Sequence, residues 1–250
     1  MTAALWPLGL GVMGAILGSF IAALAIRWPE ERSVMRGRSA CDACGAALTP
    51  RELVPLVSYV VQRGHCRRCG ARIDPWHPGV ELAAVAIGVL AGFAAPGWDG
   101  VAGAVFGWLL LALAALDVRA FWLPDRLTGL LGVTGLAAGL ASFAPTLDER
   151  LIGGIAGYGS LAAIAWGYRR WRGRDGMGGG DPKLMGAIGL WLGWRMLPAV
   201  LVIASLIGLG VALFARVRGA KVTADMPLPF GALLAIAAYA AWLAMIAFAA

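Results

Sequence analysis

The run VAGAVFGWLLLALAAL, from Val101 to Leu116, decides the fold class of this chain. It contains no charged residue, and the acidic residue Asp117 follows it directly. A helix needs about 20 largely apolar residues to cross a bilayer, and several other runs in the chain meet or approach that length. The sequence therefore predicts an all-α fold, a polytopic bundle of transmembrane helices.

The composition of the whole chain supports this interpretation. Of 250 residues, 60% are hydrophobic and only 14% are charged, and the mean hydropathy is +0.77. Soluble domains carry about 25% charged residues. The chain therefore has too little polar surface for a water-soluble fold of this length.

The apolar runs predict about eight spans. Their ranges are roughly 5–26, 80–95, 101–118, 127–144, 151–168, 183–196, 198–215 and 229–249. The sixth range is short and is interpreted as tilted, half-inserted or fused with its neighbour. The first run has no basic segment before it, so we expect a retained helix rather than a cleaved signal.

The distribution of basic residues predicts the orientation. Loops rich in Lys and Arg remain in the cytoplasm. Nine arginines lie within 27–79, four follow the fifth span up to Arg174, and Arg216, Arg218 and Lys221 follow the seventh. The opposite loops carry only Arg150 and Arg195. If the N-terminus lies outside the cytoplasm, every basic loop lies in the cytoplasm. The net charge of +7 is then mainly a topology signal, with membrane lipids rather than nucleic acid as the partner.

The first cytoplasmic loop contains all four cysteines, in two CxxC pairs. The pairs are Cys41/Cys44 and Cys66/Cys69, and 21 residues separate them. This spacing is typical of a zinc ribbon, in which two tight turns supply four thiolates to a tetrahedral structural site. Gly45 and Gly70 follow the two pairs, where such turns need a positive φ. Disulfides are the alternative, but they are rare in the cytoplasm. The sequence favours a small zinc-ribbon-like loop domain.

Two aspartates at the predicted cytoplasmic boundary are the strongest chemical signal. Asp117 ends the third span, and Asp181 follows the glycine-rich stretch Gly176–Gly180. Ionisable residues at membrane depth are costly and indicate function. Two adjacent carboxyl groups share a proton, so one acts as a base and the other as an acid. Structural alternatives remain open: Asp181 as a helix N-cap, and Asp117 in an ion pair with Arg119 or Arg126.

The motifs, taken together, resemble those of the type IV prepilin peptidases, the A24 family of membrane aspartyl peptidases. The matching segments are Gly18-Ser-Phe20 with Arg27-Trp-Pro29, the CxxC loop with Val54–Tyr59, Val80-Glu-Leu82, Asp117–Thr128, Met177–Asp181 with Lys183-Leu184, and Pro229-Phe-Gly231. The resemblance covers nearly the full length. Departures occur at Ala22 and Trp76-His77.

The resemblance implies the activity and the site. The catalytic pair would be Asp117 and Asp181, an intramembrane aspartic endopeptidase that removes the basic leader of prepilins or pseudopilins after a glycine. Asp125, Gly178, Gly180 and Lys183 would support the site, with Asp125 also fitting a helix cap. Many family members then methylate the new N-terminus with S-adenosylmethionine. The expected location is the bacterial inner membrane, as a multi-pass protein with its active site facing the cytoplasm.

These expectations divide the chain into three segments. Residues 1–27 form the first transmembrane helix, 28–79 the cytoplasmic loop domain, and 80–250 the membrane-embedded peptidase domain. A non-enzymatic scaffold, with the zinc loop as a docking module for a pilus or secretion machine, is the alternative function. A transporter is disfavoured because the charged residues lie at the ends of the spans.

Overall fold

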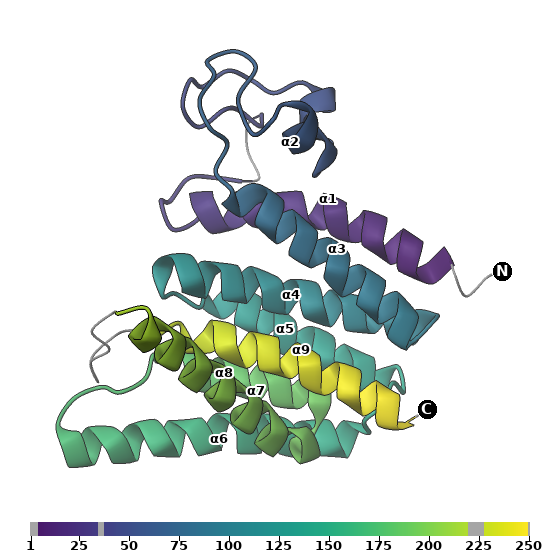
Figure 1. Ribbon diagram of the computed structural model, residues 1–250. Helices are drawn as coiled ribbons and strands as arrows, with labels where there is room; N and C mark the ends of the chain where they lie inside the picture. Colours follow the sequence, from purple (N-terminus) through teal and green to yellow (C-terminus); the bar gives the residue numbers. More distant parts are fainter. Residues whose placement is uncertain (1–4, 35–37, 220–227, 250) are drawn as a thin grey trace. The chain divides into compact units, whose positions relative to one another are not determined.

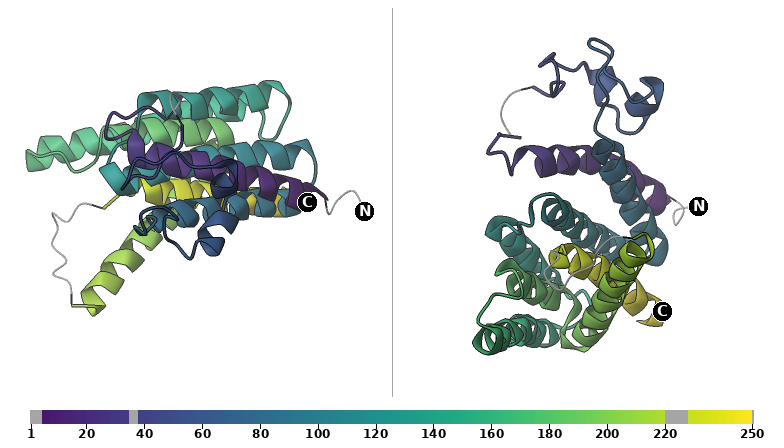
Figure 2. Two further views of the ribbon diagram at one scale, coloured as in Figure 1. Left: turned by 90° about the horizontal axis from the view of Figure 1, so that it is seen from above. Right: turned by 60° about the vertical axis from the view of Figure 1, so that its left-hand side comes forward.

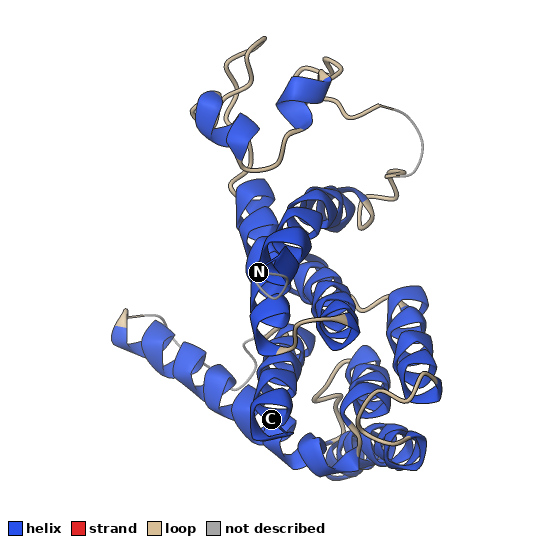
Figure 3. Cartoon of the chain, turned by 90° about the vertical axis from the view of Figure 1, so that its right-hand side faces the viewer, coloured by secondary structure: helices blue, strands red, loops and turns tan. Residues whose placement is uncertain are grey.

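The structure, a computed structural model, describes residues 5–34, 38–219 and 228–249. Arg36 and Lys221, two of the basic residues that predict the orientation, lie outside the described residues. Figure 3 shows helices joined by loops. Within the described residues there is no strand, and isolated β-bridges occur at Ala40–Ala47 and His65–Arg72. The predicted all-α class is confirmed.

Each predicted span contains a helix (Figure 1). The helices are α1 (Leu5–Arg27), α2 (Val57–Val61), α3 (Trp76–Ala94), α4 (Trp98–Ala120), α5 (Asp125–Leu140), α6 (Leu147–Arg172), α7 (Gly180–Leu192), α8 (Leu197–Val217) and α9 (Phe230–Ala249), with short 3₁₀ helices at Pro50–Leu53 and Trp194–Met196. Within the described residues, six segments are long and apolar enough to cross a membrane: α1, α3, α4, α6, α8 and α9.

Two of the eight predicted spans form shorter helices. α5 has 16 residues and α7 has 13. α7 ends where Gly193 adopts a left-handed φ of +70°, a conformation that favours glycine. The predicted span ran on to 196 because the apolar residues Trp194 and Met196 follow Gly193, with Arg195 between them.

The chain forms two compact units, Met1–Ala115 and Leu116–Ala250. In the first unit α1 packs along α3, as Figures 1 and 2 show. A methyl group added at Gly14 of α1 would overlap the backbone carbonyl of Ala84 in α3. Trp108 of α4 donates its indole N–H to the same carbonyl at 2.9 Å. Small residues allow this close approach of helix backbones. The division into three segments proposed from the sequence stays a prediction.

In the second unit α7 is the buried helix. Its side chains Leu184, Met185, Ile188 and Leu192 are almost fully buried, and α5 and α6 pack against it. A helix that is apolar on all faces belongs in a core. The N-terminal turn of α7 carries Asp181, so the packing of this short helix determines where that carboxyl group lies.

Arg150 of α6 ties the ends of neighbouring helices together. Its side chain is only 1% exposed. It donates hydrogen bonds of 2.9–3.2 Å to the carbonyl oxygens of Gly135, Phe143, Ala144, Pro145, Leu190 and Trp191. Carbonyls in the last turn of a helix lack intrahelical partners and favour a cation. The sequence-based interpretation of Arg150 as a loop charge is therefore wrong, and its role is structural.

A pair of glycine variants on α6 tests the packing of α7. A methyl group at Gly153 would overlap the Gly189 carbonyl of α7, whereas one at Gly159 meets nothing within 4 Å. Gly153→Ala is expected to cost about 1–3 kcal/mol of stability through overpacking, and Gly159→Ala to be neutral or slightly stabilising. Thermal unfolding of the detergent-solubilised protein measures both. Equal melting temperatures for the two variants would contradict the packing described.

Candidate active site and cysteine cluster

Asp117 lies one turn before the end of α4, with 5% of its surface exposed. Its Oδ2 accepts a hydrogen bond of 2.8 Å from the backbone N–H of Ala232, in the first turn of α9. The N-terminus of a helix carries partial positive charge. The first turn of α9 therefore stabilises the ionised form of Asp117.

Asp181 lies in the first turn of α7 and is also 5% exposed. Its Oδ2 accepts a hydrogen bond of 3.1 Å from the N–H of Gly178. The N-cap of α7 is Gly179, so the alternative interpretation of Asp181 as the N-cap is wrong. The carboxyl group instead closes the glycine loop that leads into the helix.

The two carboxyl groups line one cavity of about 830 Å³ within the second unit. The other walls come from Phe121, Trp122 and Leu123 after α4, from the glycine loop, and from Phe230 of α9. A peptide segment with apolar side chains would find apolar walls here. Both buried carboxyl groups would then meet the same bound molecule.

Burial and, to a smaller extent, the negative charge of Asp117 together raise the pKa of Asp181 to about 6, against the lowering effect of the Gly178 hydrogen bond. Asp181 lies outside the six membrane-crossing segments. The electrostatic effect of Asp117 shows that the two groups interact. A carboxyl group with a pKa near 6 keeps its proton over part of the neutral range and can act as an acid.

Leu123 holds three segments of the site together. Methyl groups added at Gly180 of α7 and Gly231 of α9 would each lie 2.8 Å from Leu123 side-chain carbons, and that at Gly231 would lie 3.0 Å from Asp117 Oδ2. These two glycines let the N-termini of α7 and α9 approach the segment after α4. Gly178 faces Asp181 Oδ2, from which an added methyl group would lie 3.2 Å away.

Asp125 and Lys183 join the two aspartate-bearing segments on their exposed side. Lys183 Nζ lies 2.7 Å from Asp125 Oδ1. Asp125 is the first residue of α5, and the N-cap is Pro124 without a side-chain cap hydrogen bond. The capping role predicted for Asp125 is therefore wrong. Its position instead fits a supporting role, because it connects α5 to the helix that carries Asp181.

The four cysteines gather in the loop of the first unit. Their Sγ atoms all lie within 4.8 Å of one another, and Cys41 and Cys69 are 4.0 Å apart. A tetrahedral zinc–thiolate site with bonds of about 2.3 Å places its sulfurs about 3.8 Å apart. All four cysteines are free. This arrangement fits a metal site, and the spacing is too wide for the S–S bond of a disulfide.

The backbone around the cluster favours thiolates. Gly45 and Gly70 adopt φ of +70°, which confirms the predicted left-handed turns after each CxxC pair. Backbone N–H groups of Cys69 and Arg68 lower the pKa of the Cys66 thiol to about 7, whereas burial and the neighbouring thiols raise the pKa of Cys69 to about 11. A thiolate is the form that binds metal. The structure thus brings together all four residues that the cysteine spacing singled out.

Sequence reasoning missed two features of the aspartate site. One is the backbone N–H of Ala232, which no side-chain pattern could reveal, although Pro229-Phe-Gly231 marked the segment. The other is Phe121, whose left-handed φ of +49° turns the chain after α4 towards the cavity. Non-glycine residues in this region are uncommon and cluster at functional sites.

Two family models match the chain. The model described as "Type IV leader peptidase family" matches residues 104–213, and the one described as "Bacterial Peptidase A24 N-terminal domain" matches residues 12–94. The first range contains both aspartates. The second contains the cysteine cluster.

Several curated proteins are similar over most of the chain, and the three that follow share the name prepilin leader peptidase/N-methyltransferase. That of Burkholderia pseudomallei strain K96243 is 40% identical, over 90% of this chain and 81% of the relative. The protein of Burkholderia pseudomallei strain 1026b is 44% identical, over 83% of this chain and 67% of the relative. That of Pseudomonas aeruginosa PAO1 is 39% identical, over 94% and 88%. No solved structure matches the chain.

The raised pKa of Asp181 predicts a pH-dependent stability effect. Its folded-state value of about 6 exceeds the ordinary 3.8, so the fold opposes ionisation of this group. The free-energy cost of burying the charged carboxylate is absent at low pH, where the group is protonated in both the folded and the unfolded states. It develops as the pH rises from 3.8 to about 6. Asp181→Asn should therefore raise the melting temperature more at about pH 8 than at about pH 4.

The exposed Asp175, which also lines the cavity and pairs with Arg169 at 2.6 Å, provides the control. Asp175→Asn, measured at the same two pH values, gives the effect of removing an exposed carboxyl group from the same cavity. If Asp181→Asn changed the melting temperature equally at the two pH values, the Asp181 carboxyl group would ionise freely in the folded protein.

Proposed function

The chain belongs to the type IV leader peptidase family, and on this basis we propose that Asp117 and Asp181 form the catalytic pair of a membrane aspartic endopeptidase. The substrate class is the prepilins or pseudopilins, from which the enzyme removes a basic leader after a glycine. The single observation that carries the residue assignment is the burial of both carboxyl groups in one cavity.

The environments of the two aspartates support different roles. Both carboxyl groups are buried, but Asp117 accepts a hydrogen bond from the first turn of α9, which favours a carboxylate. Asp181 accepts from the loop N–H of Gly178, and its pKa is raised to about 6. The pair holds one proton between its two members. Asp117 is then the base that takes a proton from water, and Asp181 is the acid that donates to the scissile carbonyl oxygen.

The chemistry follows from these roles. Water attacks the carbonyl carbon as its proton passes to Asp117, and the oxygen of the resulting tetrahedral intermediate takes the proton of Asp181. Collapse of the intermediate breaks the C–N bond, and the leaving amine takes the proton that Asp117 received. The leader is released as a carboxylic acid, and Asp181 recovers its proton from the collapsing hydroxyl group.

The supporting residues position the pair. Gly178 donates to Asp181, and Gly180 allows α7 to pack on Leu123. The Asp125–Lys183 ion pair links α5 with α7. In the scaffold alternative the two buried carboxyl groups have no role. Burying ionisable groups in a membrane protein is costly, so this alternative does not explain their presence.

Loss of either aspartate is expected to abolish cleavage. Asn keeps the shape of the side chain but cannot carry the transferred proton, so Asp117→Asn and Asp181→Asn should each lower the rate at least about 10²-fold. Mass spectrometry of a co-expressed prepilin measures this. Asp175→Asn, on the exposed rim of the same cavity, should cleave normally. Normal cleavage by either catalytic variant would exclude the aspartyl mechanism.

The four cysteines are proposed to hold one structural zinc ion. The sulfur positions fit a tetrahedral site, and a four-thiolate site is closed to substrate, as structural sites are. Zinc would then stabilise the loop and leave the aspartates to do the chemistry. The cytoplasm keeps such thiols reduced.

Metal analysis tests this proposal. The purified protein should contain one zinc per chain, and Cys66→Ala should lose it and become more sensitive to proteolysis between Cys41 and Cys69, because structural zinc contributes directly to folding. Cleavage should fall only partly. Treatment of the unmodified protein with a chelator should reproduce the proteolysis. Two disulfides per chain and no bound metal would refute the proposal.

We also propose that the new N-terminus is methylated with S-adenosylmethionine as the methyl donor. The relatives' shared name includes N-methyltransferase. A peptidase cavity with two carboxyl groups supplies no methyl donor, so this activity needs a site of its own.

The protein is a multi-pass protein of the bacterial inner membrane, and we propose that its active site faces the cytoplasm. The last turn of α6 carries Arg169, Arg170 and Arg172, and its first turn carries Asp148 and Glu149. This distribution agrees with a cytoplasmic C-terminal end for α6.

Thiol labelling tests the orientation at two exposed positions. An impermeant thiol reagent applied to intact spheroplasts should label Asp99→Cys, in the first turn of α4, and not Trp171→Cys, at the end of α6. In inverted vesicles the pattern should reverse. The unmodified protein gives the background from the native cysteines. Labelling of Trp171→Cys from outside would reverse the proposed topology.

A further inference from the structure

The side chain of Leu123 lies between the N-termini of two helices in the second unit. Its Cδ1 would be 3.1 Å from a methyl group added at Gly180 of α7 and 2.8 Å from one added at Gly231 of α9. Both distances are shorter than an ordinary contact between carbon atoms, which is about 3.5–4.0 Å. One leucine therefore excludes a side chain from the start of each helix.

Leu123 also borders the reaction centre. It is half-buried and lines the aspartate cavity. The methyl position on Gly231 that lies 2.8 Å from Leu123 Cδ1 also lies 3.0 Å from Asp117 Oδ2. The isobutyl group and the carboxyl group thus adjoin the same small space, which is too narrow even for a methyl group.

The residue before the cut is the part of a substrate that must come closest to this space. Its carbonyl carbon has to reach the carboxyl pair for water to attack, and its Cα is bonded to that carbon at about 1.5 Å. A side chain on this Cα therefore meets the walls immediately around Asp117 and Asp181. Glycine has no Cβ and so has nothing to place there.

Other apolar residues of the cavity are held less firmly. Trp122 and Leu228 also line it, but they are 39% and 37% exposed. An exposed side chain can turn away from a bound peptide. Leu123 is confined between the backbones at Gly180 and Gly231, and close-packed surroundings resist displacement of a side chain. Of these three, Leu123 is the side chain that a substrate cannot push aside.

We propose that Leu123 determines the specificity of the peptidase for glycine before the cut, and the proposal rests on the function proposed above. Its isobutyl group occupies the space that a side chain on the cut residue would need. One extra methylene in a fitted pocket changes kcat/KM by about 10–200-fold. A substrate with alanine in place of that glycine is therefore cut more slowly by a factor in this range.

Competition between two substrates tests the proposal. Two purified prepilins, identical except for Gly or Ala before the cut, are mixed with the full-length, detergent-solubilised protein. The two released leaders differ by one methylene, so mass spectrometry of both gives the ratio of the kcat/KM values. The unmodified protein should prefer glycine at least about tenfold, and Leu123→Ala should reduce the preference to about threefold or less.

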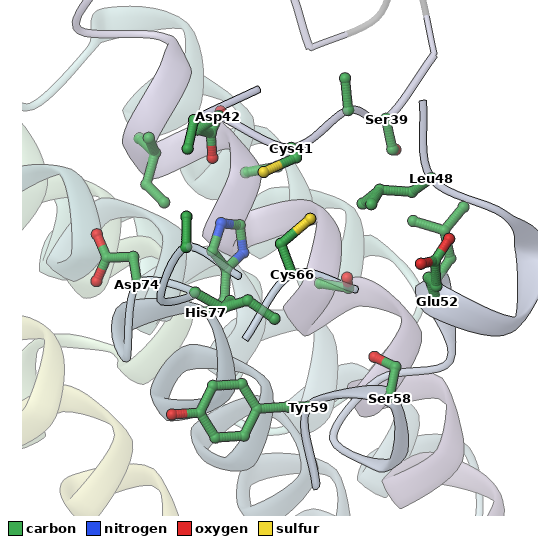
Figure 4. Close-up of a pocket in the computed structure, with 18 of the residues that line it drawn as sticks. Ser39, Cys41, Asp42, Leu48, Glu52, Ser58, Tyr59, Cys66, Asp74 and His77 are labelled. Atoms are coloured by element: carbon green, nitrogen blue, oxygen red, sulfur yellow. The ribbon is translucent and has the colours of Figure 1, made fainter. Parts of the chain in front are cut away.

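Two other leucines provide matched controls. Leu228→Ala removes the same atoms from the same cavity. Leu48→Ala removes them from a half-buried leucine of the cavity of about 490 Å³ within the first unit, shown in Figure 4. Both variants should keep the glycine preference of the unmodified protein. A purely structural role of Leu123 would slow the cutting of both prepilins equally and leave the preference unchanged.

A double variant tests the contact without any substrate. Gly231→Ala should lower the melting temperature of the unmodified protein, and should lower it less in Leu123→Ala, which lacks the δ-carbons that the added methyl group meets. Additive changes in melting temperature would overturn the proposal, because Leu123 would then not fill the space beside Gly231.

A milder variant covers the case in which Leu123→Ala does not fold. Leu123→Val keeps part of the packing and should still reduce the glycine preference, by about twofold or more. An unchanged preference in the folded variants, or no preference in the unmodified protein, would overturn the proposal and leave the peptidase function intact. If the unmodified protein cuts neither prepilin, the peptidase function itself is contradicted.

Discussion

Close backbone packing between α6 and α7 is the constraint on which the second unit depends. A methyl group at Gly153 or Gly189 would overlap a carbonyl of the facing helix, so glycine is needed on both sides of this contact. α7 is too short to cross a bilayer alone, and its neighbours hold it inside the bundle. Its C-terminal carbonyls reach Arg150, and its N-terminal turn carries Asp181 into the cavity. The position of the Asp181 carboxyl group therefore depends on the contact between Gly153 and Gly189, which lies more than one helical turn away.

The same close packing makes the two aspartates chemically different. Glycine at position 231 lets the first turn of α9 approach Asp117 and supply the Ala232 N–H. Asp181 receives its N–H from the loop before its own helix. A helix terminus stabilises negative charge more than a single loop N–H does, and in the proposed mechanism this difference makes Asp117 the base and Asp181 the acid. The asymmetry needs no additional charged residue, because backbone groups create it.

The sequence predicted the features that depend on composition and local spacing. Apolar runs located the eight helical segments, since hydropathy determines which segments enter a bilayer. The CxxC pairs located the cysteine cluster and its left-handed glycines at 45 and 70, because the turn geometry is local. The interpretation failed where the partner is distant in the sequence. Asp125 caps nothing and pairs with Lys183, and Arg150 lies buried among carbonyls. Such contacts leave no side-chain pattern in the sequence.

The buried acidic residues of the described chain, Glu81, Asp117 and Asp181, share one feature. Each accepts a hydrogen bond from a backbone N–H of a loop or helix terminus: Leu56, Ala232 and Gly178, respectively. An arginine or lysine partner would neutralise the carboxylate and occupy both of its oxygens, often in a bidentate pair. A single backbone donor offsets part of the cost of burial and leaves acceptor capacity facing the cavity. The three carboxyl groups line two cavities, one in each unit. A backbone donor thus satisfies part of each buried carboxyl group and leaves acceptor capacity on all three, two of them in the second unit and one in the first.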